Sequence, residues 1–94
     1  MLNELARRMT AARRDAPLSD ASRARVCAAV CEMFDEEHAV REVGAQARLA
    51  RRLRVADAVV HKARKGEGLT RELARKVARA RKVALAELLG EGER

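Results

Sequence analysis

Apolar residues between positions 46 and 89 recur at the spacing of short amphipathic helices. Residues three and four apart lie side by side on a helix, so a helix over 46–53 presents one apolar face. That face consists of Leu49, Ala50 and Leu53. After a break at 54–56, a second short helix is predicted over 57–64, with an inward face of Val59, Val60 and Ala63. Two short helices joined by three or four residues are typical of a helix-turn-helix.

The segment before position 46 also has helical periodicity. An amphipathic helix is predicted over 2–14 from the stripe of Leu2, Leu5, Met9 and Ala12, and Pro17 follows its end. Ser19 or Asp20 can cap the next helix, whose predicted apolar face is Val26, Cys27, Val30, Cys31 and Phe34, with Met33 beside it. The acidic run at 35–37 leaves two alternatives open. It lies on one long helix, or it caps a new helix over 36–43 that stops at Gly44.

The C-terminal part completes a helical pattern. Thr70 is the predicted cap of a helix over 71–81, with Leu73, Val77 and Ala80 inward. Leu85, Leu88 and Leu89 form a last turn, and 91–94 is expected to be a flexible tail. Ala, Arg, Leu and Glu are strong helix formers and are abundant, while the chain has one Phe and no Tyr or Trp. These features predict an all-α protein, a small helical bundle whose core is built from Leu, Val, Ala and Met.

A set of positions in the C-terminal half follows a family pattern. It consists of Gln46, Leu49-Ala50, Val55, Val60, Gly66 and Val83-Ala-Leu85-Ala-Glu-Leu88-Leu89, in that order and without a gap. In these positions the segment 46–89 resembles the Cro/repressor-type (xenobiotic-response-element-like) helix-turn-helix family. The resemblance implies a lambda-repressor-like helix-turn-helix domain over 41–90, which binds double-stranded DNA by docking a recognition helix at about 57–65 in the major groove.

The family register also implies roles for individual residues. Lys62 lies where a base contact is expected, and a lysine there can donate to guanine O6 and N7. Asp57 and Ala58 occupy two other base-reading positions and are weak readers, and His61 can add a donor beside them. Gln46 and Lys65 are expected to hold phosphates by family position. The complete set of predicted phosphate ligands is Gln46, Arg48, Arg51, Arg54 and Lys65.

Four positions depart from the family pattern. Arg54 and Lys82 stand where the family usually has Gly in a turn, so mild backbone strain is expected at both. Ala56 stands where Ser or Thr usually caps the recognition helix, and Arg64 stands where Glu is common. Asp57 is an alternative cap that would start the recognition helix one residue later.

Positive charge is concentrated in the same segment. The chain carries a net charge of +7, yet residues 46–82 contain thirteen Arg or Lys against three acidic residues. A basic module beside an acidic remainder is typical of a nucleic-acid binder, because neutralised phosphates release counterions. The other reading of this charge is that Arg and Lys only solvate helix surfaces. We therefore expect a DNA-binding transcriptional regulator, cytoplasmic and associated with the nucleoid.

Two alternative functions and a partner surface remain open at this point. The chain could be a protein-interaction module of antitoxin or adaptor type, or a weakly specific nucleoid-type DNA binder. Residues 1–40 are the expected surface for a homodimer, since a short helix over 2–14 cannot bury its own apolar stripe. The same residues are the expected surface for a protein partner.

Other classes of chemistry find little support. Cys27, Cys31 and His38 would share one face of a continuous helix, but the spacing is not that of a zinc finger, and small thiols also fill helical cores. No metal or cofactor is therefore expected. The chain has no nucleophile beside a base and an orienting acid, so we do not expect an enzyme. No apolar run approaches the length of a membrane span.

Overall fold

The computed structural model describes residues 17–90, and all regular structure in this part of the chain is helical. The helices are α2 (Asp20–Val40), α3 (Ala45–Leu53), α4 (Asp57–Arg64), α5 (Arg71–Arg81) and α6 (Leu85–Leu89). The predicted all-α bundle is confirmed. The helix predicted over 2–14 and the tail at 91–94 lie outside the described residues.

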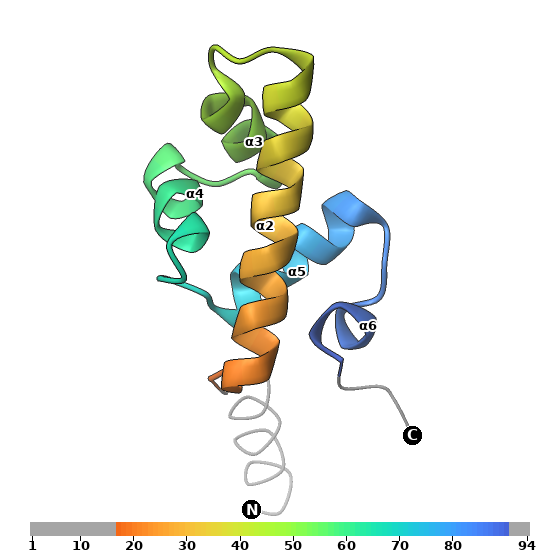
Figure 1. Cartoon of the computed structure of the whole chain (residues 1–94). Helices are drawn as coiled ribbons and strands as arrows, with labels where there is room; N and C mark the ends of the chain where they lie inside the picture. The colour runs from red at the N-terminus through yellow and green to blue at the C-terminus, as the bar shows by residue number, and fades with distance from the viewer. Residues whose placement is uncertain (1–16, 91–94) are drawn as a thin grey trace, which may run out of the picture.

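Helix α2 is the central element of the bundle. It stands upright in Figure 1, with α3 and α4 along one side and α6 on the other, and among the described elements it contacts four helices, these three and α5. The N-cap of α2 is Ser19, whose hydroxyl accepts a hydrogen bond from the Ser22 backbone N–H at 3.1 Å. The acidic run at 35–37 continues α2, so the alternative of one long helix is the observed one.

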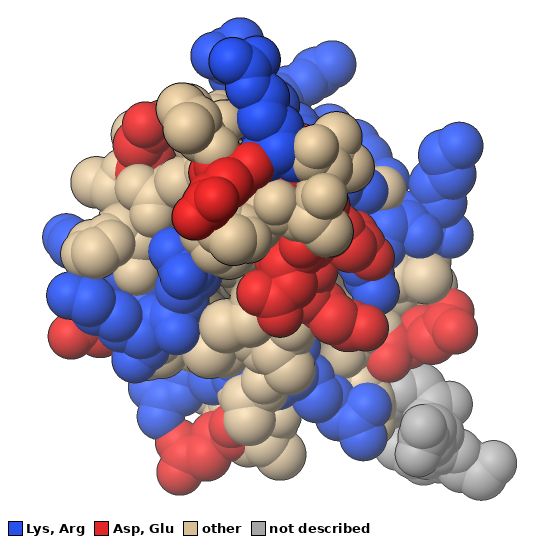
Figure 2. All heavy atoms as spheres, turned by 45° about the horizontal axis from the view of Figure 1, so that its top comes forward, with Lys and Arg blue, Asp and Glu red and all other residues tan. Residues whose placement is uncertain are grey.

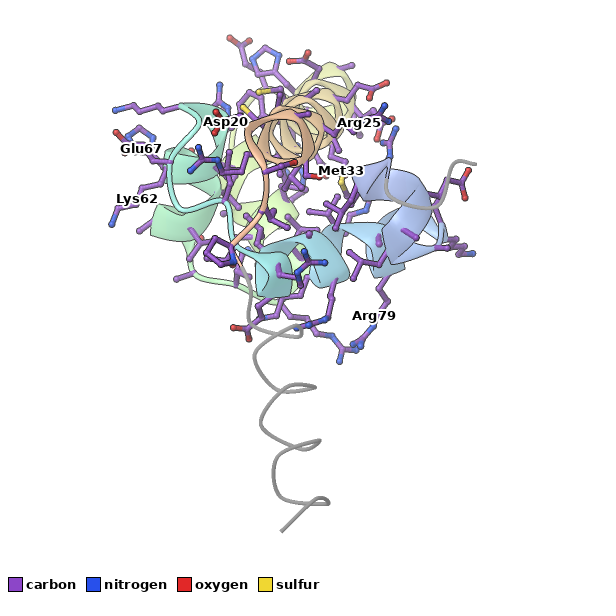
Figure 3. The ribbon with its side chains drawn as sticks, turned by 90° about the horizontal axis from the view of Figure 1, so that it is seen from below. Asp20, Arg25, Met33, Lys62, Glu67 and Arg79 are labelled. Carbon is purple, nitrogen blue, oxygen red and sulfur yellow. The ribbon has the colours of Figure 1, made fainter. Side chains whose placement is uncertain are left out.

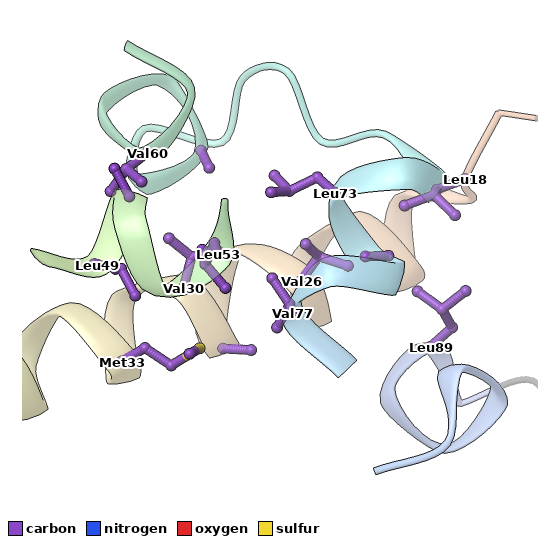
Figure 4. Close-up of a cluster of buried hydrophobic side chains, with 14 residues drawn as sticks. Leu18, Val26, Val30, Met33, Leu49, Leu53, Val60, Leu73, Val77 and Leu89 are labelled. Atoms are coloured by element: carbon purple, nitrogen blue, oxygen red, sulfur yellow. The ribbon is translucent and has the colours of Figure 1, made fainter. Parts of the chain in front are cut away.

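A single cluster of buried side chains joins all five helices (Figure 4). Its most enclosed large members are Met33, Leu49, Leu53, Val26, Val30, Val60 and Val77. Residues before and after position 40 thus share one core, and the predicted division at this point does not separate two cores. The core is aliphatic, as expected from a chain with almost no aromatic residues.

The predicted apolar face of α2 is confirmed at Val26 and Val30 and is wrong at three other positions. The buried residues of α2 are Ser22, Val26, Ala29, Val30 and Met33. Cys27, Cys31 and Phe34, which were expected in the core, are only half-buried at its margin. The helices packed on α2 bury the face that carries Val26, Val30 and Met33, while Cys27 and Cys31 lie at its edge against the Arg64 backbone oxygen at the end of α4.

The ends of α3 and α5 share one geometry. Arg54 and Lys82 have φ of 59° and 58°, and the next residues close each turn: the Val55 N–H donates to Ala50 O at 2.9 Å and the Val83 N–H donates to Ala78 O at 3.0 Å. This pattern is a Schellman motif, whose left-handed residue is usually Gly. The strain expected at Arg54 and Lys82 therefore has a structural basis.

The start of α4 differs from one expectation. Its N-cap is Ala56, which has no side chain to accept a hydrogen bond, and the helix begins at Asp57. The alternative that Asp57 itself caps the helix is wrong, because Asp57 already lies in the first turn. There its carboxylate lies near the positive end of the helix dipole.

Lys82→Gly is expected to stabilise the protein by about 1 kcal/mol, since Gly adopts a positive φ without the Cβ clash that Lys incurs. Urea unfolding followed by circular dichroism measures this. Arg79→Gly, an exposed position within α5, is the matched control and should destabilise by about 1 kcal/mol. Equal destabilisation by both substitutions would mean that Lys82 is not strained.

Candidate nucleic-acid interface

Helix α4 has one face in the core and one face in solvent. Val60 and Ala63 are fully buried, and Val59 is half-buried. The predicted base-reading residues Asp57, Ala58, His61 and Lys62 are all exposed. Seen from below in Figure 3, Lys62 points away from the body of the molecule. The structure thus brings these four residues together on the outer surface of α4.

The exposed face of α4 follows directly after the short turn that joins α4 to α3. The two helices pack against each other and are separated only by residues 54–56, as predicted for a helix-turn-helix. Eight residues of α-helix are about 12 Å long, comparable to the width of about 12 Å of a DNA major groove. Val55 packs against the core from within the turn and holds the turn to the bundle.

Several arginines are paired with the acidic residues of α2. Arg48 Nε donates to Glu37 Oε1 at 3.0 Å. Its two terminal nitrogens donate to the backbone oxygens of Glu37, Arg41 and Val43. Arg48 therefore joins the end of α2 to α3. The phosphate contact predicted for Arg48 has no support in this geometry, because four of the five guanidinium N–H donors are already used.

Two further arginines are held in the same way. Arg52 lies 3.5 Å from Glu37 and 3.8 Å from Glu36, and Arg81 lies 3.3 Å from Glu36 and 3.5 Å from Glu32. Acidic side chains gather near the centre of the face drawn in Figure 2, with Lys and Arg on either side. The acidic residues of α2 thus neutralise the cations that α3 and α5 turn toward them.

Other cations have no acidic partner within residues 17–90. The exposed ones without an ion pair there are Arg25, Arg41, Arg51, Arg54, Lys62, Arg64, Lys65, Arg79 and Lys82. Four of them are predicted site residues: Arg51 on α3, Arg54 in the turn, Lys62 on α4 and Lys65 directly after α4. Arg79 lies on a different side of the molecule from Lys62 (Figure 3). Gln46, the remaining predicted phosphate ligand, is half-buried in the first turn of α3.

The C-terminal end of α4 is attached to α2 by contacts that the sequence did not predict. The Arg64 guanidinium carbon lies 3.4 Å from the centroid of the Phe34 ring, which is a cation–π contact. The Arg64 backbone oxygen accepts from the thiols of Cys31 and Cys27, with Sγ to O distances of 3.7 and 3.9 Å. Burial and the neighbouring Cys27 thiol raise the pKa of Cys31, so this thiol stays protonated and able to donate at neutral pH.

The possible metal ligands noted in the sequence do not converge. The His38 ring stacks on Phe34 with centroids 5.8 Å apart, and His38 Nε2 lies 3.9 Å from Glu42. Within residues 17–90, no group of three or more His, Cys, Asp or Glu side chains could hold a metal ion. The aromatic spacing of Phe34 and His38, four residues apart on α2, was the signal for this stacking.

None of the helices in the described part of the chain has the length and apolar character needed to cross a membrane. The exposed residues of α4 and the cations without ion pairs define the candidate interface, which is the outer face of α4 together with the cations of the α3–α4 turn. Comparison of the chain with family models, with curated proteins and with solved structures gave no match.

Proposed function

We propose that the protein is a regulator that binds double-stranded DNA with α4 in the major groove. The observation that carries this proposal is the distribution of charge. Arg48, Arg52 and Arg81 are paired with the glutamates of α2, whereas Arg51, Arg54, Lys62 and Lys65, on or next to α3 and α4, have no acidic partner in the described chain. A short exposed helix in the positive electrostatic field of these cations is suited to a groove lined by phosphates.

The contacts divide into two kinds. In this proposal Lys62 reads a guanine edge, with His61, Asp57 and Ala58 beside it, since these side chains share the exposed face of α4. The phosphate backbone of the DNA is held by Arg51, Arg54, Lys65 and Gln46. Arg48 is given a different role, because it fixes the start of α3 to α2. Phosphate contacts of this kind set register and affinity, while base contacts set sequence.

Affinity for duplex DNA is expected to fall steeply with salt. If about six phosphates are neutralised, the slope of log K against log salt concentration is roughly −5. Fluorescence anisotropy of a labelled duplex between low and moderate salt measures it. Arg25→Ala is the control, because the exposed Arg25 lines a hollow that contains no residue of α3 or α4, so its loss should leave the slope nearly unchanged. A flat response of the unaltered protein would remove the DNA-binding proposal.

Selection of bound duplexes from a random pool then tests specificity. An enriched motif supports a base-reading regulator, and an inverted repeat of that motif supports the homodimer that we also propose. Binding without enrichment indicates the weakly specific nucleoid-type binder. In that case the outer face of α4 contributes charge and no base reading.

A protein-interaction module is the second candidate. It is favoured by two exposed valines at the end of α2, where Val40 is 82% and Val43 is 74% exposed. Apolar side chains this exposed and close together can mark a contact with a partner protein. Val40→Ser together with Val43→Ser should abolish the partner contact of an adaptor or antitoxin and leave DNA affinity unchanged, and a pull-down with and without this pair of substitutions separates the two functions.

A further inference from the structure

Cys27 and Cys31 form a pair of accessible thiols outside the core. They are four residues apart on α2, so their side chains lie on one face of the helix. Both are free and only half-buried, and neither belongs to the buried cluster. Packing alone therefore does not account for two thiols at these positions.

Both thiols converge on one atom of the candidate DNA-binding helix. Each is within sulfur hydrogen-bond distance of the Arg64 backbone oxygen, at the last residue of α4. Beside them is an open hollow of about 270 Å³ lined by Cys31, Asp35, His61, Arg64 and Lys65. Cys31 is thus reachable from solvent through this hollow, and both thiols lie against the end of α4.

We propose that Cys27 and Cys31 form a dithiol site for a thiophilic, two-coordinate cation of the Hg²⁺ class, and that its occupation releases the end of α4 and weakens DNA binding. The regulatory half of this proposal rests on the proposed function. Soft thiolates select soft cations, and two neighbouring thiolates can hold one cation by chelation. A tetrahedral Zn²⁺ site needs four ligands, and the described residues contain no group of even three.

The binding step follows from the chemistry of the thiols. Each S–H loses its proton to solvent and each sulfur forms one bond to the cation, so two protons leave and no electron is transferred. The Arg64 oxygen then loses both of its thiol donors and faces two sulfurs that can only accept. The two hydrogen bonds from these thiols to the last residue of α4 are therefore lost.

The first experiment measures capture of Hg²⁺ without DNA. The protein should bind one Hg²⁺ per chain, lose both titratable thiols and keep the cation against excess 2-mercaptoethanol. A sulfur-to-mercury absorption band is well suited to the measurement, because the chain has no Trp or Tyr to absorb beneath it. Cys27→Ser and Cys31→Ser should each give up the cation to the competing monothiol. Equal loss from the unaltered protein would overturn the dithiol site.

The second experiment tests the coupling to α4. Loading with Hg²⁺ should lower DNA affinity by about 5- to 150-fold, the usual range for coupled sites. The matched control carries Cys27→Ser and Cys31→Ser with Ala24→Cys and Ala28→Cys, which moves the same spacing to exposed positions on α2. This variant should capture Hg²⁺ equally well and bind DNA unchanged. Equal weakening of DNA binding in both proteins would overturn the coupling.

The coupling between the dithiol site and α4 can be tested even if the protein does not bind DNA. If the metal-free protein does not bind duplex DNA, hydrogen exchange of the α4 amides replaces DNA affinity as the measurement. Faster exchange on Hg²⁺ loading of the unaltered protein, and not of the relocated pair, supports the site. Unchanged exchange in both proteins contradicts it.

Discussion

Val60→Asp is expected to unfold the protein or to destabilise it by about 3–5 kcal/mol, the usual cost of an uncompensated buried charge. Val60 is fully buried on the inner face of α4, among the residues that join α4 to α3 and α2. Thermal and urea unfolding followed by circular dichroism measure the effect. The core is small, so few other large side chains contribute apolar contacts when those of Val60 are lost.

His61→Asp is the matched control for this experiment. It places the same carboxylate one residue later, where the side chain is exposed, so the free energy of unfolding should change by less than about 0.5 kcal/mol. DNA affinity should nevertheless fall, since the new charge faces phosphates. If His61→Asp unfolds the protein as Val60→Asp does, the inner and outer faces of α4 have been assigned incorrectly.

Lys62→Ala and Arg51→Ala are expected to weaken DNA binding in different ways. Loss of a base-reading lysine should cost about 1–3 kcal/mol on the preferred site and relax the preference at one base pair. Loss of a phosphate contact at Arg51 should weaken binding to all sequences alike and lower the salt slope by about one unit. Both side chains are exposed, so neither substitution should disturb the fold.

The comparison needs the preferred duplex and a random duplex, each titrated at several salt concentrations. The ratio of the two affinities reports base reading, and the slope reports phosphates. Should Lys62→Ala weaken binding to both duplexes equally, α4 reads no bases at this position. The protein would then belong with weakly specific binders of DNA.

The helices over 46–53, 57–64 and 71–81 were predicted within one residue of their observed bounds. Each is short, carries apolar residues three and four apart, and is bounded by Gly, a break or a capping Thr, so local sequence determines it. The exposure of the four predicted base-reading residues followed from the same periodicity. Their role in DNA binding remains a prediction.

Features that depend on contacts between distant segments could not be predicted. Arg48 looked like any other cation of the basic segment, yet its donors are used by the end of α2. The face that α2 buries depends on which helices cover it, and α2 carries apolar or small residues around much of its surface. The contact of Arg64 with Phe34 joins residues 30 positions apart, and no local pattern indicates it.

The hydroxyl of Ser22 lies buried at the first turns of α2 and donates to the backbone oxygen of Leu89 at 3.1 Å, across 67 positions of sequence. The first described helix therefore acquires its final environment only from the last one. During synthesis on the ribosome, α2 emerges early but stays without this cover until Leu89 has been made and released from the exit tunnel. Among the described residues, its apolar face is the part that a chaperone would meet for longest, and a ribosome stalled before Leu89 would hold the bundle incomplete.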